Sequence, residues 1–107
     1  MASTRKRKEE VARIQGFIQP REQTSLRDVW RAFVTGGTWE RVGKASRRIA
    51  RFRHKRYRGQ VRLEWWGKAL RFAVEDADTS GRIGGAFLGH VQRHGRSAVD
   101  RMDLQFR

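Results

Sequence analysis

The sequence has no cysteine, a single proline and no long hydrophobic run. Without cysteine, the protein cannot form disulfide bonds, use a thiolate nucleophile or hold zinc through sulfur. No stretch of about 18 apolar residues is present for a membrane-spanning helix, and the basic start is not followed by the apolar segment of about 7 to 15 residues that a secretory signal requires. We therefore expect a cytoplasmic protein without a membrane partner, associated with a nucleoid or a ribonucleoprotein if it binds nucleic acid.

Acidic residues are scarce, because 11 Asp and Glu stand against 25 Lys and Arg, for a formal net charge of +14. Repulsion among these cations costs stability unless an anionic partner relieves it. Four Trp, six Phe and one Tyr in 107 residues provide enough large side chains for one hydrophobic core. We expect a single domain over residues 11–107, preceded by a disordered basic arm at residues 1–10 that carries charge and no core residue.

A first helix is predicted for residues 25–35. Ser25 and Asp28 have the spacing of a capping box, and Gly36 follows as a stop signal. One face carries Leu26, Val29, Trp30 and Phe33. Thr38 then favours the start of a second helix over residues 38–54, in which apolar and basic side chains separate onto opposite faces. Its apolar face would contain Trp39, Val42, Ala45, Ile49 and Phe52.

After Gly59 the apolar residues recur at every second position, which is typical of a strand. A turn at Gly67 and Lys68 leads into further apolar runs over residues 70–74, 83–91 and 102–106. These runs predict a three- or four-stranded antiparallel sheet over residues 57–107, packed on the two helices in an α+β fold. Residues 11–20 fit a short helix or a short strand, and Pro20 ends either one.

The candidate binding site is the cationic side of the predicted second helix together with the strands that follow it. No acidic residue lies between Glu40 and Glu64, whereas solvated helix faces usually interleave Glu with Lys. Neutralised phosphates supply most non-specific affinity for DNA or RNA, and Arg can both fork onto a phosphate and stack on a base. The residues that we expect to bind nucleic acid are Arg41, Lys44, Arg47, Arg48, Arg51, Arg53, Lys55, Arg56 and Arg58, with Arg62, Trp66 and Arg71 on the adjoining strands.

Trp65 and Trp66 are neighbours in a predicted strand, so their side chains must point to opposite faces of the sheet. We expect Trp65 in the core and Trp66 on the outer face, near Arg62 and Arg71. There Trp66 would either stack on an unpaired base or cover a sheet face through which two copies of the chain associate.

The basic stretch has two further interpretations. The order of helix, glycine-containing turn, second helix and hairpin is also that of a winged helix-turn-helix, which places a basic helix in the major groove of DNA. Residues 47–58 also resemble, in composition, the arginine-rich segments of RNA-binding proteins. The sequence does not distinguish DNA from RNA, or single from double strands.

Two alternative functions belong to other classes. Small basic ribonuclease toxins resemble the chain in predicted architecture alone, and such an enzyme would need a cleft that holds His54, His90 or His94 close to arginine. A structural or adaptor protein would instead dock its basic face on an acidic partner. On the favoured interpretation the protein is not an enzyme, and no cofactor is implied.

No metal site is expected. The stretch from Asp76 to Ile83 begins like an EF-hand calcium loop, but Phe87 stands where the loop requires a bidentate glutamate, so a polar hairpin turn explains it better. His90 and His94 have the four-residue spacing of a zinc pair on a helix, yet the predicted strand would place them apart.

Overall fold

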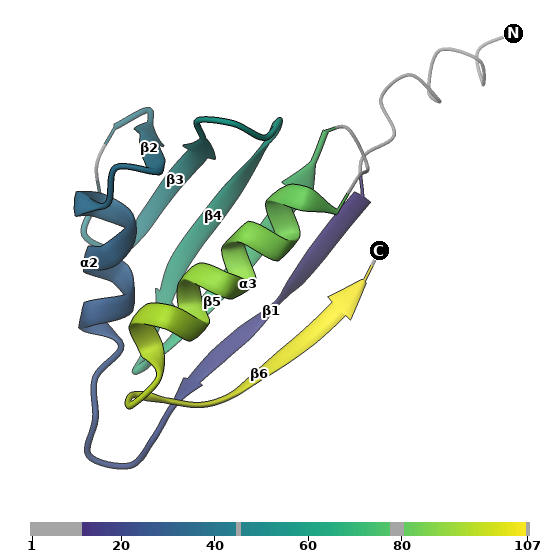
Figure 1. Ribbon diagram of the computed structural model, residues 1–107. Coiled ribbons are helices and arrows are strands. Elements are labelled where there is room, and N and C mark those ends of the chain that lie inside the picture. The colour runs from purple at the N-terminus through teal and green to yellow at the C-terminus, as the bar shows by residue number, and fades with distance from the viewer. Residues whose placement is uncertain (1–11, 45, 78–80, 107) are drawn as a thin grey trace, which may run out of the picture.

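The computed structural model describes residues 12–44, 46–77 and 81–106 (Figure 1). The predicted basic arm lies outside these ranges. The described elements, in chain order, are β1 (Ala12–Pro20), α2 (Arg27–Thr35), β2 (Trp39–Val42), β3 (Ile49–His54), β4 (Gly59–Trp66), β5 (Ala69–Asp76), α3 (Arg82–Gly95) and β6 (Val99–Phe106). Neither of these helices has the length and apolar content needed to cross a membrane.

The strands form one antiparallel sheet in the order β2-β3-β4-β5-β1-β6. Both helices pack on the same side of this sheet, so the fold has two layers and one sheet face without helices, which we call the open face (Figure 1). The first strand is inserted between β5 and β6, where Ile14 pairs with Val74 on one side and with Phe106 on the other.

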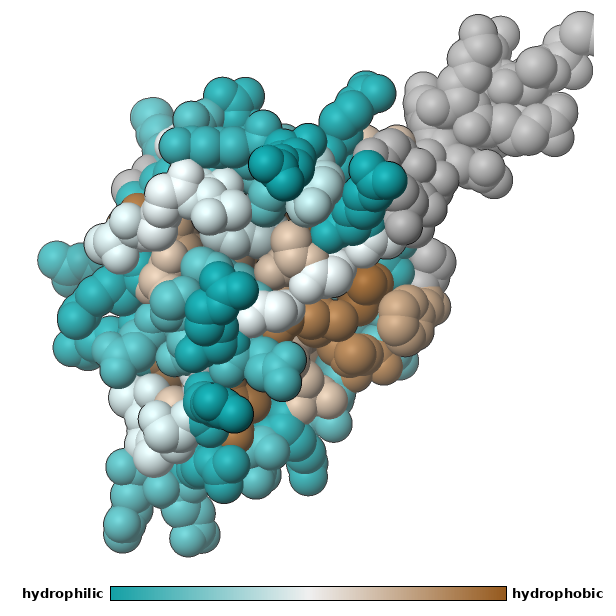
Figure 2. Space-filling view, in the orientation of Figure 1, coloured by the Kyte–Doolittle hydropathy of each residue, from teal (hydrophilic) through white to brown (hydrophobic). Residues whose placement is uncertain are grey.

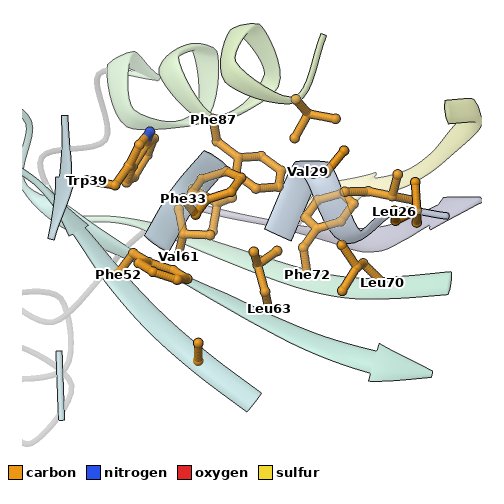
Figure 3. Close-up of a cluster of buried hydrophobic side chains, with 14 of the residues drawn as sticks. Leu26, Val29, Phe33, Trp39, Phe52, Val61, Leu63, Leu70, Phe72 and Phe87 are labelled. Atoms are coloured by element: carbon orange, nitrogen blue, oxygen red, sulfur yellow. The ribbon is translucent and has the colours of Figure 1, made fainter. Parts of the chain in front are cut away.

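The core lies between the helices and the sheet, because alternate residues of each strand point toward the helices. Phe33 of α2 is at its centre, with ring centroids 5.3 Å from Trp39, 5.5 Å from Phe52 and 5.6 Å from Phe87 (Figure 3). Phe33 is completely buried, so helix α2 is anchored to β2, β3 and α3 by a single aromatic side chain.

The predicted helix over residues 38–54 is wrong. This segment forms β2 and β3, joined by a loop, and Trp39 pairs with His54 across the two strands. Within β3, Ala50 and Phe52 point to the core while Arg51 and Arg53 are exposed, which is strand alternation. Gly43 has a φ of 78°, so the backbone leaves the helical region between the two strands. The winged helix-turn-helix interpretation fails with this helix.

The size of the predicted sheet is also wrong, since six strands are present and not three or four. Two of the additional strands are β2 and β3, and the ambiguous segment at residues 11–20 supplies β1. The run at residues 83–91, predicted as a strand, is helix α3, in which Ile83, Phe87 and Val91 follow one another at four-residue steps and are buried. The general α+β class, the helix near residues 25–35 and the hairpin that turns at Gly67 agree with the structure.

Strand β6 forms one edge of the sheet and is only partly covered. Leu104 is 38% exposed and Phe106 is 74% exposed. Figure 2 shows hydrophobic residues gathered beside α3 and over β6, whereas hydrophilic residues cover most of the surface around α2. The exposed hydrophobic residues of β6 therefore lie away from the hydrophilic surface around α2.

Candidate nucleic-acid interface

The basic residues predicted to share one helix face are divided among three surfaces. Beside α2, Arg41 of β2 and Arg47 of the β2–β3 loop line one surface. Lys44 lies in the same loop, and the side chain of Arg48 contacts Glu64 on the open face. The turn that joins β3 to β4 carries Lys55, Arg56 and Arg58. On the open face of the sheet lie Arg51, Arg53, Arg62 and Arg71.

The first surface is a cleft, which we call the tryptophan cleft, between α2, the β2–β3 loop and the β4–β5 turn. Its volume is about 810 Å³. Five cations and two tryptophans line it, and none of its described lining residues is Asp or Glu. The lining residues are Thr24, Ser25, Leu26, Arg27, Trp30, Arg31, Val34, Thr35, Arg41, Arg47, Trp65, Gly67 and Lys68.

Helix α2 presents Arg27, Arg31 and Thr35 to this cleft because residues four apart lie on the same helix face. The backbone N–H of Arg27 donates to the side-chain oxygen of Ser25 at 3.1 Å just before the helix, whereas the N-cap residue Leu26 makes no side-chain capping bond. The hydroxyl of Thr35 donates to the carbonyl of Arg31 at 2.9 Å. The positions of the two arginines are thus set by an amphipathic helix whose other face is core.

The two tryptophans of the cleft pack on each other. The ring centroids of Trp30 and Trp65 are 5.5 Å apart, with an angle of 32° between the ring planes. The backbone N–H of Trp65 donates to the carbonyl of Arg48 at 2.9 Å, which ties the end of the β2–β3 loop to β4. An aromatic floor is thereby held beside a loop that carries arginine.

Arg41 connects the cleft to the core. Its guanidinium lies 6.0 Å from the ring centroid of Phe52, and its Nε is buried without a hydrogen-bond acceptor among the described residues. A buried guanidinium N–H without an acceptor is unfavourable.

The second surface is a groove of about 600 Å³ at the opposite end of β2, which we call the histidine groove. Its walls come from the start of β2, the β3–β4 turn and one face of α3. The described residues that line it include three cations and no carboxylate. They are Gly37, Thr38, Trp39, His54, Lys55, Arg56, Tyr57, Gly85, Ala86, Gly89, His90 and Arg93.

His54 is held as a neutral imidazole. The backbone N–H groups of Arg56 and Tyr57 donate to its Nδ1 at 3.0 and 3.2 Å, so Nδ1 must carry a lone pair and the ring proton is on Nε2. Desolvation, with a smaller contribution from the charge of Arg56, lowers the pKa of His54 below its ordinary value of 6.5. The ring of Tyr57 stacks on the His54 ring, with centroids 4.6 Å apart.

His90 is also neutral, but its proton is on the other nitrogen. Desolvation is the main reason that the pKa of His90 is lowered, with His94, Arg93 and His54 acting in the same direction against a hydrogen bond to the backbone of Ala32. Nε2 of His90 is buried without a partner among the described residues, so the bond to Ala32 is made by Nδ1–H. Two neutral histidines therefore contribute to the groove.

The prediction that His90 and His94 lie apart is wrong, because α3 brings their ring centroids to 4.5 Å. Even so, no three His, Asp or Glu side chains of the described residues are grouped so that they could hold a metal ion. The predicted polar hairpin turn after β5 is also wrong, since the chain enters α3 there and the N–H of Gly81 donates to the carboxylate of Asp76.

On the third surface, the open face, acids contact some of the cations. Arg53 pairs with Glu40, with 2.7 Å between Nε and Oε1, and Arg62 lies 3.6 Å from Glu64. Arg48 also contacts Glu64, and Arg13 contacts Glu75. The directly opposed pair of Arg51 and Arg62 is a like-charge contact on this face. The open face therefore has acids among its cations, unlike the described lining of the two grooves.

The predicted orientations of the paired tryptophans are confirmed. Trp65 faces the helices, whereas Trp66 is 47% exposed on the open face. The guanidinium of Arg71 lies 5.5 Å from the Trp66 ring centroid, and the ring of Phe17 meets it edge-on at 5.9 Å. Trp66 is thus fixed between a cation and a second aromatic ring.

Several residues of the two grooves were not predicted from the sequence. They are Arg27, Trp30, Arg31 and Lys68 in the tryptophan cleft, and Tyr57, Gly85, Gly89 and Arg93 in the histidine groove. The four-residue spacing of Arg27, Arg31 and Thr35 was a usable signal for the first group. The second group depends on the packing of α3 on β4 and β5, which brings α3 beside Trp39 and His54, and no local pattern reveals this packing.

Comparison with known proteins gives no relative from which a function could be taken. No protein-family model, curated protein or solved structure gives a significant match to the chain.

Proposed function

We propose that the protein binds single-stranded nucleic acid in the tryptophan cleft. The observation that carries this proposal is the combination of five cations and two tryptophans in one cleft whose described lining residues include no carboxylate. Cations bind the phosphates, and aromatic faces stack on bases, so this combination suits an unpaired strand.

The sizes of the cleft and of its partners favour a single strand over a duplex. A cavity of about 810 Å³ accepts one or two nucleotides, whereas a duplex would contact only its rim. Stacking on Trp30 or Trp65 also requires a base that is not already stacked in a helix. Arg27, Arg31 and Arg47 would then hold the backbone, because a guanidinium can donate two parallel hydrogen bonds to a phosphate.

The proposed activity is binding and not catalysis. A ribonuclease that works without metal needs a general acid and a general base at the same pH. Burial lowers the pKa of both histidines of the histidine groove, which disfavours the imidazolium that a pair of histidines would need as its general acid. Their hydrogen bonds support a structural or binding role.

The test is a binding measurement with a labelled single strand of about 20 nucleotides and the matching duplex, by fluorescence anisotropy at low salt. Arg31→Gln should weaken single-strand binding by about fivefold or more, because it removes a phosphate contact. Arg96→Gln is the matched control, since it removes the same charge from an exposed residue at the end of α3, outside the cleft. Equal loss in both variants would contradict a specific cleft and indicate a general charge effect.

An acidic protein is the competing type of partner, because the same cations would bind carboxylates. Competition with poly-glutamate, which has negative charge but no bases, distinguishes a nucleic-acid partner from an acidic protein. If poly-glutamate displaces the strand at equal charge concentration, and Trp30→Ala binds the strand like the wild type, the nucleic-acid proposal is wrong.

A further inference from the structure

The histidine groove lies at the other end of β2 from the tryptophan cleft and has an ordered set of hydrogen-bond donors. Lys55, Arg56 and Arg93 provide three cations, and His54 adds an Nε2–H because its Nδ1 accepts from the backbone. Among the described lining residues no side-chain carboxylate competes for these donors. Such a donor set is suited to an anion with several oxygen atoms, above all a phosphate.

The groove also has surfaces suited to a flat ring. On one side, Tyr57 stacks on His54, with an angle of 20° between the ring planes. On another, α3 exposes Gly85 and Gly89, where a Cβ atom would meet nothing within 4 Å. Two glycines four residues apart leave a flat stretch of helix without side chains, so a planar group can approach the backbone closely.

One donor and one acceptor beneath this groove lack partners among the described residues. Trp39 is only 3% exposed, and both its Nε1–H and the Nε2 lone pair of His90 are buried and unpaired. The two rings are near each other, with centroids 6.1 Å apart, and the indole nitrogen of Trp39 faces α3 in Figure 3. Both atoms are covered by the groove wall, so a ligand reaches them only when that wall moves. A nucleobase edge, which has an acceptor next to a donor, would then satisfy both atoms.

We propose that the histidine groove is a second binding site, for one nucleotide unit. The phosphate would be held by Lys55, Arg56 and Arg93, and the base would lie over Gly85 and Gly89 with its edge toward Trp39. A volume of about 600 Å³ is within the range of about 300 to 1,000 Å³ that is usual for small-ligand sites. The nucleotide can come from a free nucleoside monophosphate or from a strand, and the proposal does not depend on binding in the tryptophan cleft.

The test uses isotope-labelled full-length protein and NMR spectra recorded during titration with AMP, GMP, CMP or UMP. At least one nucleotide should shift the indole N–H signal of Trp39 and the amide signals of Gly85 and Gly89, and the shifts should saturate in the millimolar range or below. The matching nucleoside and inorganic phosphate should each bind at least about tenfold more weakly, because each makes only part of the contacts. Arg31→Gln should leave these shifts unchanged, which separates this site from the tryptophan cleft.

A variant that fills the groove gives the control. Gly89→Leu adds a side chain where there is open space, and a leucine also has a higher helix propensity than glycine, so the fold should be preserved while the shifts are lost. Gln92→Leu adds the same side chain at an exposed position of α3 outside the groove and should bind like the wild type. If Gly89→Leu does not fold, Arg93→Gln serves in its place and should weaken binding by about fivefold or more.

Titration with a 5′-phosphorylated single strand shows whether the bound nucleotide is a free nucleoside monophosphate or part of a strand. Shifts with a mononucleotide support a free nucleotide as ligand, and shifts with the strand alone, absent in Gly89→Leu, support a nucleotide within a strand. No shift at Trp39, Gly85 and Gly89 with either probe, or shifts that persist in Gly89→Leu, would overturn the proposal.

Discussion

Trp30 of α2 and Trp65 of β4 meet in a tilted stack, with ring centroids 5.5 Å apart, at the point where the core opens into the tryptophan cleft. Both side chains are half-buried, so each contributes to packing and also presents aromatic surface to the cleft. In contrast, Trp66 is on the open face and contacts Phe17 and Arg71. Variants of Trp30 and Trp66 can therefore test whether bases bind in the tryptophan cleft or on the open face.

Trp30→Ala should weaken binding of a single strand by about tenfold or more, because each base stacked on an aromatic ring contributes about 1 to 3 kcal/mol. Duplex binding should change much less. Anisotropy titrations with both substrates measure this, and circular dichroism confirms that the variant is folded.

The control for that experiment is Trp66→Ala, which should leave single-strand affinity within about twofold if the tryptophan cleft is the binding site. If Trp66→Ala loses affinity and Trp30→Ala does not, the bases stack on the open face and not in the tryptophan cleft. A change in sedimentation mass without a change in affinity would assign Trp66 to a contact between two copies of the chain.

Binding should depend steeply on salt. If about six phosphates are neutralised, affinity for nucleic acid should fall by about a thousandfold between about 50 and 200 mM salt. Arg47→Gln should reduce the slope of this dependence, because Arg47 lines the tryptophan cleft. Arg62→Gln should leave the slope unchanged, because Arg62 is on the open face within reach of Glu64. A flat dependence would rule out phosphates as the main contact.

Phe52→Ala should destabilise the fold by about 3 to 5 kcal/mol, since it leaves a cavity in the core beside Phe33. Arg51→Ala, one residue earlier in β3 and on the open face, should change stability by less than about 0.5 kcal/mol. Urea unfolding measures both variants. Similar losses in the two would mean that β3 does not alternate between core and open face.

Stability should decrease when the pH falls below the ordinary histidine pKa of 6.5. Burial lowers the pKa of His54 and of His90 in the folded state, so between the lowered values and 6.5 the unfolded chain binds more protons than the folded one. The stabilising effect of these neutral rings is fully present above pH 6.5 and is lost as the pH falls through their lowered folded-state values. Urea midpoints at pH 7.5, 6.5 and 5.5 test this, and His90→Gln should flatten the dependence.

The hairpin at residues 59–76 could be predicted from the sequence because its alternation is strict. Val61, Leu63 and Trp65 face the core, and Gly67 adopts the positive φ of 60° that the turn needs. In residues 38–54 the apolar residues that form β2 and β3 also happen to recur at three- and four-residue steps, as in a helix. The helix prediction relied on the three-residue step from Ile49 to Phe52. The sheet instead follows the two-residue alternation of Ala50, Phe52 and His54.

Helix α3 was missed for the opposite reason. Gly84, Gly85 and Gly89 lower its helix propensity, so the run looked like a strand with turns. Tertiary packing overrides this propensity, because Ile83, Phe87 and Val91 bury a complete helix face against the sheet.

For the candidate site, the charge of the basic stretch was evident from the sequence, but its division among three surfaces was not. A helix would have gathered Arg41, Arg48 and Arg51 on one face. A hairpin sends alternate residues to opposite faces of the sheet, so Arg41 reaches the tryptophan cleft while Arg51 lies on the open face. The residue types therefore led to the prediction of an anionic partner, whereas their grouping required the topology.

The position of β1 between β5 and β6 has a consequence for how the chain is made in the cell. Ile14 is synthesised early, yet one of its two strand neighbours, Phe106, is separated from it by almost the whole described chain. A ribosome therefore releases β2 to β5 while one edge of β1 is still unpaired, and long-range pairing of this kind is slow and exposes strands to other chains. We expect this edge of β1 to remain available to other chains until β6 has emerged and paired with it.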